Sequence, residues 1–287
     1  MKLIALDMDG TVLTTDKRVT EGVLKAITDA KNAGHVVMIC SGRAHDDLLP
    51  YLKEKKFPNL PISGSNGSAT CIDGKMIHQV CMDKDIATQV FNWLDVNQYP
   101  FKIYTSKGVF GKSNYLEILK NEILVASPKF GDHQMTVENA VALEQNYPAI
   151  PIELFDKLIS DEELEIFKFF VLTLRSEKKQ SFKQFLTSIS GLMVTSSYPS
   201  NIEVMAKDGH KGTGMMQVAN YYNIPAEDTV AIGDNFNDVP MLKVAGFSIA
   251  MGNAEAEVKE LCDVVTLTND EDGVAHAIRT YILKTRQ

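Results

Sequence analysis

Two aspartates one residue apart, Asp7 and Asp9, end an apolar run that begins at Leu3. Such a run is typical of a buried parallel strand, and the carboxyl ends of these strands face the crevice where α/β proteins bind ligands. In a strand, side chains two residues apart point the same way, so we expect both carboxylates on one face. Two like charges this close are costly unless a cation joins them or one keeps its proton. The pair therefore indicates a metal or proton-transfer site, although a lone D-x-D is more often a solvated turn.

The residues after the aspartates fit a site of this kind. Gly10 lets the backbone turn sharply, and the Thr11 hydroxyl can orient a carboxylate. A second acidic cluster, from Asp234 to Asp238, follows another apolar run at residues 229–233. Mg²⁺ is usually held by a few carboxylates together with waters and a substrate phosphate, which this set could supply. The alternative is that these residues cap a helix, since Asp and Asn favour that position.

Two weaker signals could complete a phosphate site. Ser41 and Gly42 follow a third apolar run, and a hydroxyl with a backbone N–H can donate to a phosphate oxygen. Lys211 precedes a predicted helix, where its charge could offset that of a phosphate and the carboxylates. An ordinary strand-to-helix turn and a surface lysine are the alternatives. Arg43 is interpreted as facing solvent and His210 as a loop residue, so neither is assigned a role.

The elements that must position these residues alternate between strands and helices. Buried strands are expected near residues 3–7, 35–40, 202–205, 229–233, 247–250 and 264–267. Helices are expected at 20–30, 212–222, 254–261 and 272–283, with a hairpin around Asp73 and Gly74. This alternation predicts an α/β fold with a doubly wound, parallel, Rossmann-like sheet, formed by residues 1–82 and 191–287.

The pattern changes between residues 83 and 190. Aromatic residues become frequent, and strand-like stretches at 101–105 and 167–174 alternate with amphipathic helical ones. We expect a separate α+β domain inserted into the first. Its aromatic residues are interpreted as core, and none is assigned a binding role: Trp93, Tyr99, Phe101, Tyr104, Phe110 and Tyr115.

Composition narrows the class of protein. The chain has 287 residues, a formal net charge of −8 and 45% hydrophobic residues, so we expect one large or two modest domains and no nucleic-acid partner. No signal peptide and no apolar run of about 18 residues is present, which predicts a protein without membrane association. Four cysteines without a C-x-x-C pair are typical of buried thiols in a cytoplasmic protein. The oligomeric state stays open.

Taken together and in order, the four segments resemble the haloacid dehalogenase superfamily, known for its phosphohydrolases. Residues 7–11 are similar to its first motif, Ser41 to its second, Lys211 to its third and residues 233–238 to its fourth. The resemblance covers the whole chain. An insert between the second and third motifs is similar to that of Cof-type, subclass IIB members, in which it forms a cap that selects the substrate.

The resemblance implies roles for the matching residues. Asp7 would be the nucleophile that takes the phosphoryl group, and Asp9 the acid that protonates the leaving oxygen and then the base that activates water. Mg²⁺ would be held by Asp7, the Asp9 backbone carbonyl, Asp234 and Asn235, with Asp238 as a supporting carboxylate. The phosphate would contact the remaining motif positions, namely Met8, Ser41, Gly42, Lys211 and Asn237.

The resulting hypothesis is a Mg²⁺-dependent phosphatase that hydrolyses small phosphorylated metabolites, by resemblance sugar phosphates, through an aspartyl-phosphate. Phosphoryl transfer needs an in-line nucleophile and charge neutralisation, and these residues could provide both. Phosphomutases of the resembled superfamily usually carry their cap between the first and second motifs. Only about thirty residues separate Asp9 from Ser41, too few for a cap domain, so a phosphomutase is disfavoured. Loss of Asp7 or Asp9 would favour a non-catalytic phosphometabolite sensor, yet both residues are present. A receiver-like signalling domain would be far shorter.

Overall fold

The computed structural model describes residues 1–126, 136–146, 148–152 and 154–283. The chain forms two compact units: unit 1 comprises Met1–Val80 with Asp208–Gln287, and unit 2 comprises Cys81–Lys207. Within the described ranges, no helix combines the length and hydropathy that crossing a membrane requires.

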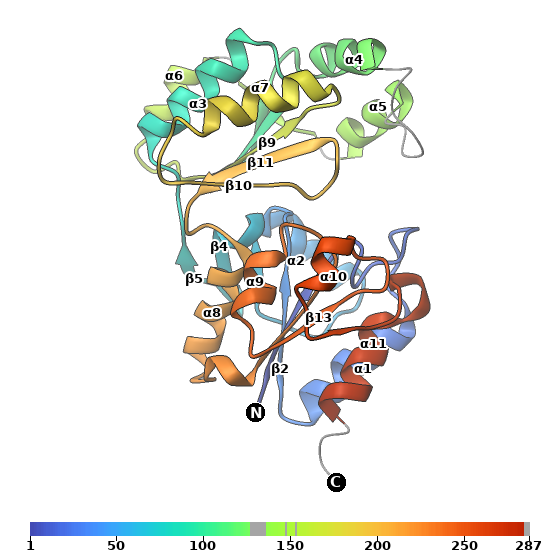
Figure 1. Ribbon diagram of the computed structural model, residues 1–287. Coiled ribbons are helices and arrows are strands. Elements are labelled where there is room, and N and C mark those ends of the chain that lie inside the picture. Colours follow the sequence, from blue (N-terminus) through green and yellow to red (C-terminus); the bar gives the residue numbers. More distant parts are fainter. Residues whose placement is uncertain (127–135, 147, 153, 284–287) are drawn as a thin grey trace. The chain divides into compact units, whose positions relative to one another are not determined.

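Unit 1 is built on an eight-stranded sheet in the order β14-β13-β12-β1-β2-β3-β4-β5 (Figure 1). The strands from β14 to β3 pair in parallel, whereas β4 and β5 run antiparallel. The expected α/β class and parallel Rossmann-like core are thus confirmed. The bounds are β1 Leu3–Asp7, β2 Val36–Cys40, β3 Ile62–Gly64, β4 Ala69–Ile72, β5 Lys75–Gln79, β12 Thr229–Gly233, β13 Phe247–Ala250 and β14 Val264–Val265.

Helices cover both faces of this sheet. Helix α1 packs with α11 and α8 packs with α9, on opposite sides in Figure 1. Thr20 caps α1 by accepting a hydrogen bond from the Val23 amide, as its position predicts. The expected C-terminal helix is α11 followed by a π-turn at Ile278–Ile282. The helices are α1 Glu21–Asn32, α2 His45–Glu54, α8 Lys211–Tyr221, α9 Val239–Val244, α10 Ala256–Glu260 and α11 Gly273–Ala277.

Unit 2 is a six-stranded sheet in the order β10-β11-β9-β6-β7-β8, with α3 and α7 on one face (Figure 1). The strands are β6 Phe101–Thr105, β7 Gly108–Lys112, β8 Ile150–Ile152, β9 Ile166–Leu172, β10 Leu192–Thr195 and β11 Asn201–Ala206. The helices are α3 Lys84–Val96, α4 Tyr115–Ala126, α5 Val137–Asn146, α6 Phe155–Ile159 and α7 Ser176–Leu186. Trp93 stacks on Phe182 and Phe185 in the core of this unit, as the aromatic pattern predicts.

The second boundary between the units differs from the expected one at 190/191. Strands β10 and β11 pair with each other and, through β11, with β9, so unit 2 continues to Lys207. The sequence indicates a strand at residues 202–205, but the same apolar run is compatible with either sheet. Pairing partners are set by contacts far along the chain, so local periodicity assigns this strand to the wrong unit.

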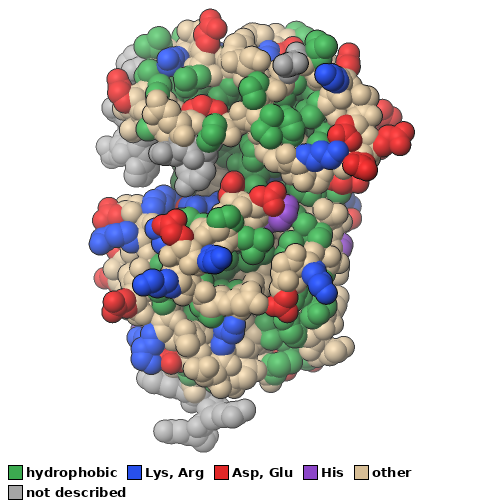
Figure 2. Space-filling view, turned by 180° about the vertical axis from the view of Figure 1, so that it is seen from behind, with side chains coloured by type: hydrophobic (Ala, Val, Ile, Leu, Met, Phe, Trp, Pro, Cys, Tyr) green, Lys and Arg blue, Asp and Glu red, His purple; other side chains and the backbone are tan. Residues whose placement is uncertain are grey.

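Charged side chains of both signs are interspersed among apolar and neutral ones on the face drawn in Figure 2. Among the described residues visible there, the basic side chains form no continuous stripe.

Candidate active site

The candidate site lies where three neighbouring strands of unit 1 end. Strand β1 runs between β12 and β2, with Leu6 beside Ile232 and Asp7 beside Cys40. The first motif follows β1, Ser41 follows β2, and Asp234 follows β12. Because parallel strands end at one edge of the sheet, segments more than 200 residues apart in sequence converge there.

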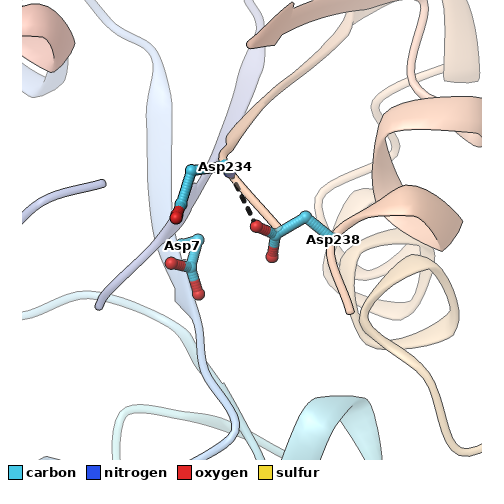
Figure 3. A group of neighbouring side chains, drawn as sticks. All are labelled: Asp7, Asp234 and Asp238. Atoms are coloured by element: carbon cyan, nitrogen blue, oxygen red, sulfur yellow. Dashed lines mark hydrogen bonds between the residues drawn. The ribbon is translucent and has the colours of Figure 1, made fainter. Parts of the chain in front are cut away.

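Three carboxylates form the centre of the site. Asp7, Asp234 and Asp238 are buried, and one oxygen from each lies within 4.8 Å of the others. Figure 3 shows these side chains turned toward one another, with Asp238 accepting a hydrogen bond from the Asp234 backbone. Asp238 directly precedes α9 but does not cap it with its side chain. Its carboxylate instead accepts from the amides of Asp234 at 2.9 Å and Asn235 at 3.0 Å.

Lys211, the first residue of α8, faces this cluster. Its ammonium is fully buried and donates to Asp7 and, at 2.5 Å, to Asp238. Burial alone would lower the pKa of Lys211, but the charges of Asp238 and Asp7 outweigh it and raise that pKa. The lysine is therefore held charged beside the carboxylates, in the position that the sequence predicts.

The cluster carries more negative charge than Lys211 balances, since three carboxylates face one ammonium. Burial and the charge of Asp238 raise the pKa of Asp7 well above its ordinary value. The same two causes raise the pKa of Asp234 to about 7. A cation placed among these oxygens would reverse both shifts, because an opposite charge favours the ionised form.

The donor set fits a hard divalent cation. Its ligand atoms are buried carboxylate oxygens close enough to share one ion, and hard cations such as Mg²⁺ prefer oxygen ligands. This acidic cluster is where the chain could hold a divalent metal ion. Of the expected metal residues, the structure brings together Asp7, Asp234 and Asp238 through their side chains.

The Thr11 hydroxyl binds a carboxylate, as the sequence predicts, and the structure shows that this carboxylate is Asp234, which Gly10 also approaches closely. The Thr11 hydroxyl donates to the Asp234 carboxylate at 2.8 Å. Gly10 has a φ of +90°, and a Cβ at this position would come within 2.9 Å of the Asp234 carboxyl carbon. A side chain here would thus be strained and would displace a residue of the cluster.

Asp9 is not one of the three clustered carboxylates. Strand β1 ends at Asp7, so the alternation of side chains does not extend to Asp9. The Asp9 carboxylate lies outside the acidic cluster and forms a bidentate pair with Arg43 at 2.9 and 2.8 Å. Lys17 donates to it at 3.0 Å. Burial would raise the pKa of Asp9, but Arg43 and Lys17 outweigh it and lower the pKa to about 2.

Arg43 is the residue that sequence reasoning missed, since it was interpreted as facing solvent. In the structure its side chain is largely buried and holds Asp9. The available signal was its place two residues after Ser41, at a strand end that the argument already used. His210, also left without a role, accepts a hydrogen bond from the Thr213 amide and caps α8.

The expected phosphate-binding residues lie around the same strand ends. Ser41 is buried, and its hydroxyl oxygen accepts from the Arg43 amide at 3.2 Å. Gly42 lies between these two residues and is half-buried. Met8 is fully buried in the turn after β1. Asn237 is buried in the loop between β12 and α9.

Asn235 is half-buried in the same loop, directly after Asp234. Its side-chain oxygen accepts from the Phe236 amide at 2.8 Å. This contact stabilises the local turn.

Comparison with known proteins identifies the family. A model of haloacid dehalogenase-like hydrolases matches residues 4–278. The chain belongs to this family. The phosphatase YwpJ of Bacillus subtilis is 31% identical over 97% of this chain and 99% of its own length. The 5-amino-6-(5-phospho-D-ribitylamino)uracil phosphatase YwtE of the same species is also 31% identical, over 97% of each chain.

Solved structures agree. A haloacid dehalogenase-like hydrolase from B. subtilis superposes with a TM-score of 0.86 at 28% identity, over 98% of this chain and all of that one (100%). The subclass IIB sugar phosphatase BT4131 superposes with a TM-score of 0.79 at 21% identity, over 98% of this chain and 99% of its own, which shows the common fold. The resemblance to haloacid dehalogenase-type hydrolases is confirmed. Family and relatives together support a phosphoric monoester hydrolase.

Proposed function

We propose that this hydrolase is a Mg²⁺-dependent phosphatase that cleaves small phosphorylated metabolites through an aspartyl-phosphate. The observation that carries the proposal is the convergence of Asp7, Asp234 and Asp238 with Lys211 at one sheet edge. Phosphoryl transfer demands positioning and neutralisation of charge more than covalent machinery. A carboxylate attacks an anionic phosphate only where cations reduce their repulsion, and this site is organised to do so.

Asp7 is the proposed nucleophile. Its carboxylate stands at the end of β1, where Lys211 donates to one oxygen, and the other oxygen is proposed to attack the phosphorus. Lys211 would also neutralise charge on the phosphoryl group as the ester bond breaks. Ser41, Gly42, Asn237 and the Met8 backbone are proposed to complete the set of donors to the phosphate oxygens.

Asp9 is the proposed acid and base. In the structure Arg43 and Lys17 hold it ionised, which is the form that takes a proton from water in the hydrolysis of the aspartyl-phosphate. In the first half-reaction it must carry a proton to the leaving oxygen, so the proposal requires Asp9 to leave Arg43 in that step. The Arg43–Asp9 ion pair is therefore compatible with the role of Asp9 as base and must break for its role as acid.

A divalent ion, proposed to be Mg²⁺, would be held by Asp7, Asp234 and the Asp9 backbone carbonyl, with Asn235 and Asp238 supporting it. When bound, it would supply positive charge to the reacting phosphate. Asp238 has a second task, because it bonds to Lys211 and to the backbone amides at Asp234 and Asn235. It thereby fixes the distance between the lysine and the loop.

Sugar phosphates are the proposed substrate class. BT4131 is described as a sugar phosphatase, and YwtE acts on a uracil that carries a phosphorylated ribityl chain. Both descriptions share a phosphate on a polyhydroxylated carbon chain, so we infer that a phosphorylated polyol is the common element. Unit 2, with bounds 81–207 in place of the expected 83–190, is proposed as the cap that selects the leaving group.

The test compares wild type with Asp7→Asn and Asp228→Asn, assayed by phosphate release from p-nitrophenyl phosphate and a panel of sugar phosphates with Mg²⁺. Asp228 is a half-buried aspartate of unit 1 that pairs with Lys2 and is not part of the acidic cluster, so it serves as the matched control. We expect turnover in wild type and Asp228→Asn and its collapse in Asp7→Asn. Intact-mass measurement after rapid acid quench should find one added phosphoryl group on wild type and on Asp228→Asn, and none on Asp7→Asn.

Retained turnover by Asp7→Asn, with deamidation excluded by mass, would remove Asp7 as the nucleophile. Inactivity of folded wild type across the whole panel would favour a phosphometabolite sensor. Phosphate transfer to an added sugar in preference to water would favour a phosphotransferase.

A further inference from the structure

The loop Ser65–Ser68, which joins β3 to β4, has an unusual backbone. Ser65, Asn66 and Gly67 follow one another with φ values of 49°, 60° and 105°. All three residues are buried. Left-handed conformations are uncommon for residues other than glycine, and consecutive ones persist where surrounding contacts determine them. The contacts of this loop therefore indicate what it is for.

Two of these contacts reach the segment after β2. The Asn66 amide donates to the Ser41 carbonyl at 2.9 Å, and the Ser65 amide donates to the Arg43 carbonyl at 2.7 Å. The left-handed turn aims two successive N–H groups at the carbonyls of Ser41 and Arg43. The loop thus supports the backbone on both sides of Gly42, which the proposed function assigns to the phosphate.

A third contact reaches the loop after β12. The Asn237 side chain donates from Nδ2 to Oδ1 of Asn66 at 3.2 Å, and both side chains are buried. The two residues are 171 positions apart in sequence. Buried polar groups that lose a partner cost the desolvation of the remaining group, so this bond restricts the Asn237 amide to one orientation.

The fourth contact is a close approach of backbones. A Cβ at Gly67 would overlap the His210 carbonyl and lie 2.8 Å from the Lys211 amide nitrogen. From the other side, a Cβ at Gly214 would come within 3.2 Å of the Gly67 Cα. The first turn of α8, which begins with Lys211, therefore rests directly on this loop.

We propose that Asn66 is a positioning residue, which holds Asn237 and Ser41 in register so that both can bind one phosphate. Its side chain orients the Asn237 amide, its backbone supports Ser41, and the glycine after it supports Lys211. Asn suits this place because it tolerates the left-handed conformation and carries a short acceptor. The inference rests on the proposed function, which assigns Ser41, Lys211 and Asn237 to the phosphate.

The test is a double-mutant cycle on kcat/KM for p-nitrophenyl phosphate with Mg²⁺, using Asn66→Gly, Asn237→Ala and the double variant. Asn66→Gly keeps the positive φ and removes only the side chain. Asn66→Ala removes the same oxygen but adds backbone strain, so its Tm should fall further. Asn223→Gly is the matched control, because Asn223 is exposed, has a φ of 54° and follows the far end of α8.

We expect kcat/KM to fall about tenfold in both Asn66→Gly and Asn66→Ala, because both lose one hydrogen bond to Asn237. The two losses should be equal even where the Tm values differ. The double variant should be within about twofold of Asn237→Ala, because residues acting through one contact are not additive. Asn223→Gly should match wild type.

The outcomes separate the two proposals. Inactivity of folded wild type would contradict the proposed function, whereas wild-type kcat/KM for Asn237→Ala would remove Asn237 from the phosphate site and overturn the positioning role with it. An impaired Asn237→Ala beside fully active Asn66 variants would overturn the positioning role alone. The positioning role would also be overturned if the fold-loss of kcat/KM in the double variant equalled the product of the two single fold-losses. Failure of both Asn66 variants to fold, or activity that follows Tm, would make Asn66 a structural residue only.

Discussion

Replacing Lys211 by methionine tests the charge balance of the site. The substitution removes two charge-assisted hydrogen bonds, to Asp7 and Asp238, from an ammonium that is fully buried. Breaking a buried ion pair by removing one partner costs about 3–5 kcal/mol, because the other charge stays buried and uncompensated. We expect the free energy of unfolding in EDTA to fall by about that amount.

A divalent ion should reverse much of this loss. With Lys211→Met, three carboxylates face one another without an ammonium, so the cluster should hold a divalent cation more tightly than wild type. A ligand that binds only the folded state at a hundred times its Kd adds about 2.7 kcal/mol. The stability difference between variant and wild type should therefore be largest in EDTA and shrink as Mg²⁺ is added.

Activity should not recover in parallel. The Lys211 ammonium is also a proposed donor to the transferring phosphate, and loss of one such donor costs about 10²–10³ in kcat. Urea unfolding in EDTA and in Mg²⁺, with phosphate release on the same samples, measures both effects. Lys243→Met, an exposed lysine of α9, is the control. Equal urea midpoints for Lys211→Met and wild type in EDTA, with wild-type turnover, would refute the reasoning.

Three further predictions concern metal removal, unit 2 and pH. EDTA should abolish phosphate release and Mg²⁺ restore it; turnover that persists in EDTA would contradict the metal proposal. Lys168→Met should lower the free energy of unfolding, measured in urea, by about 3–5 kcal/mol, because Lys168 and Glu203 form a fully buried ion pair. The double variant Lys168→Met with Glu203→Leu should recover most of that lost free energy. Bonds from the Ser248 amide and hydroxyl, both at 2.8 Å, lower the pKa of Asp263 below its ordinary value. A depressed pKa stabilises the fold above the unfolded pKa of about 3.9 and the effect disappears as pH falls through the folded value. Asp263→Asn should thus cost under about 1 kcal/mol at pH 7 and progressively less below pH 4 in thermal melts, and a pH-independent deficit would argue against this bond.

Local pattern was sufficient for most elements and for the place of the site. The strand predicted at residues 101–105 has those bounds in the structure, and the expected Asp73–Gly74 turn joins β4 to β5. Asp7, Ser41 and Asp234 could be placed at one edge because parallel strands in such sheets end together, which is a property of the fold class. The convergence did not require knowledge of any single contact.

The side-chain partners at that edge could not be predicted in the same way. Arg43 lies in a loop, where no periodicity shows which way a side chain points, so its pair with Asp9 was missed. The left-handed turn at Asn66 leaves no signal beyond a Ser-Asn-Gly stretch that is typical of any loop. Strand β11 was identified as a strand but placed in the wrong sheet, because pairing depends on residues outside any local window.

The position of β1 between β2 and β12 bears on how the protein is made. Its β2 neighbour emerges from the ribosome soon after it, but β12 follows only after the whole of unit 2. At about 5–20 residues per second, Asp234 is synthesised roughly 11–45 s after Asp7. During this interval one edge of a strand that is fully buried in the native fold has no native partner and is open to aggregation, whereas unit 2 is contiguous and can fold as it appears. Nascent chains paused before Thr229 should therefore be substrates for chaperones that bind exposed strand edges.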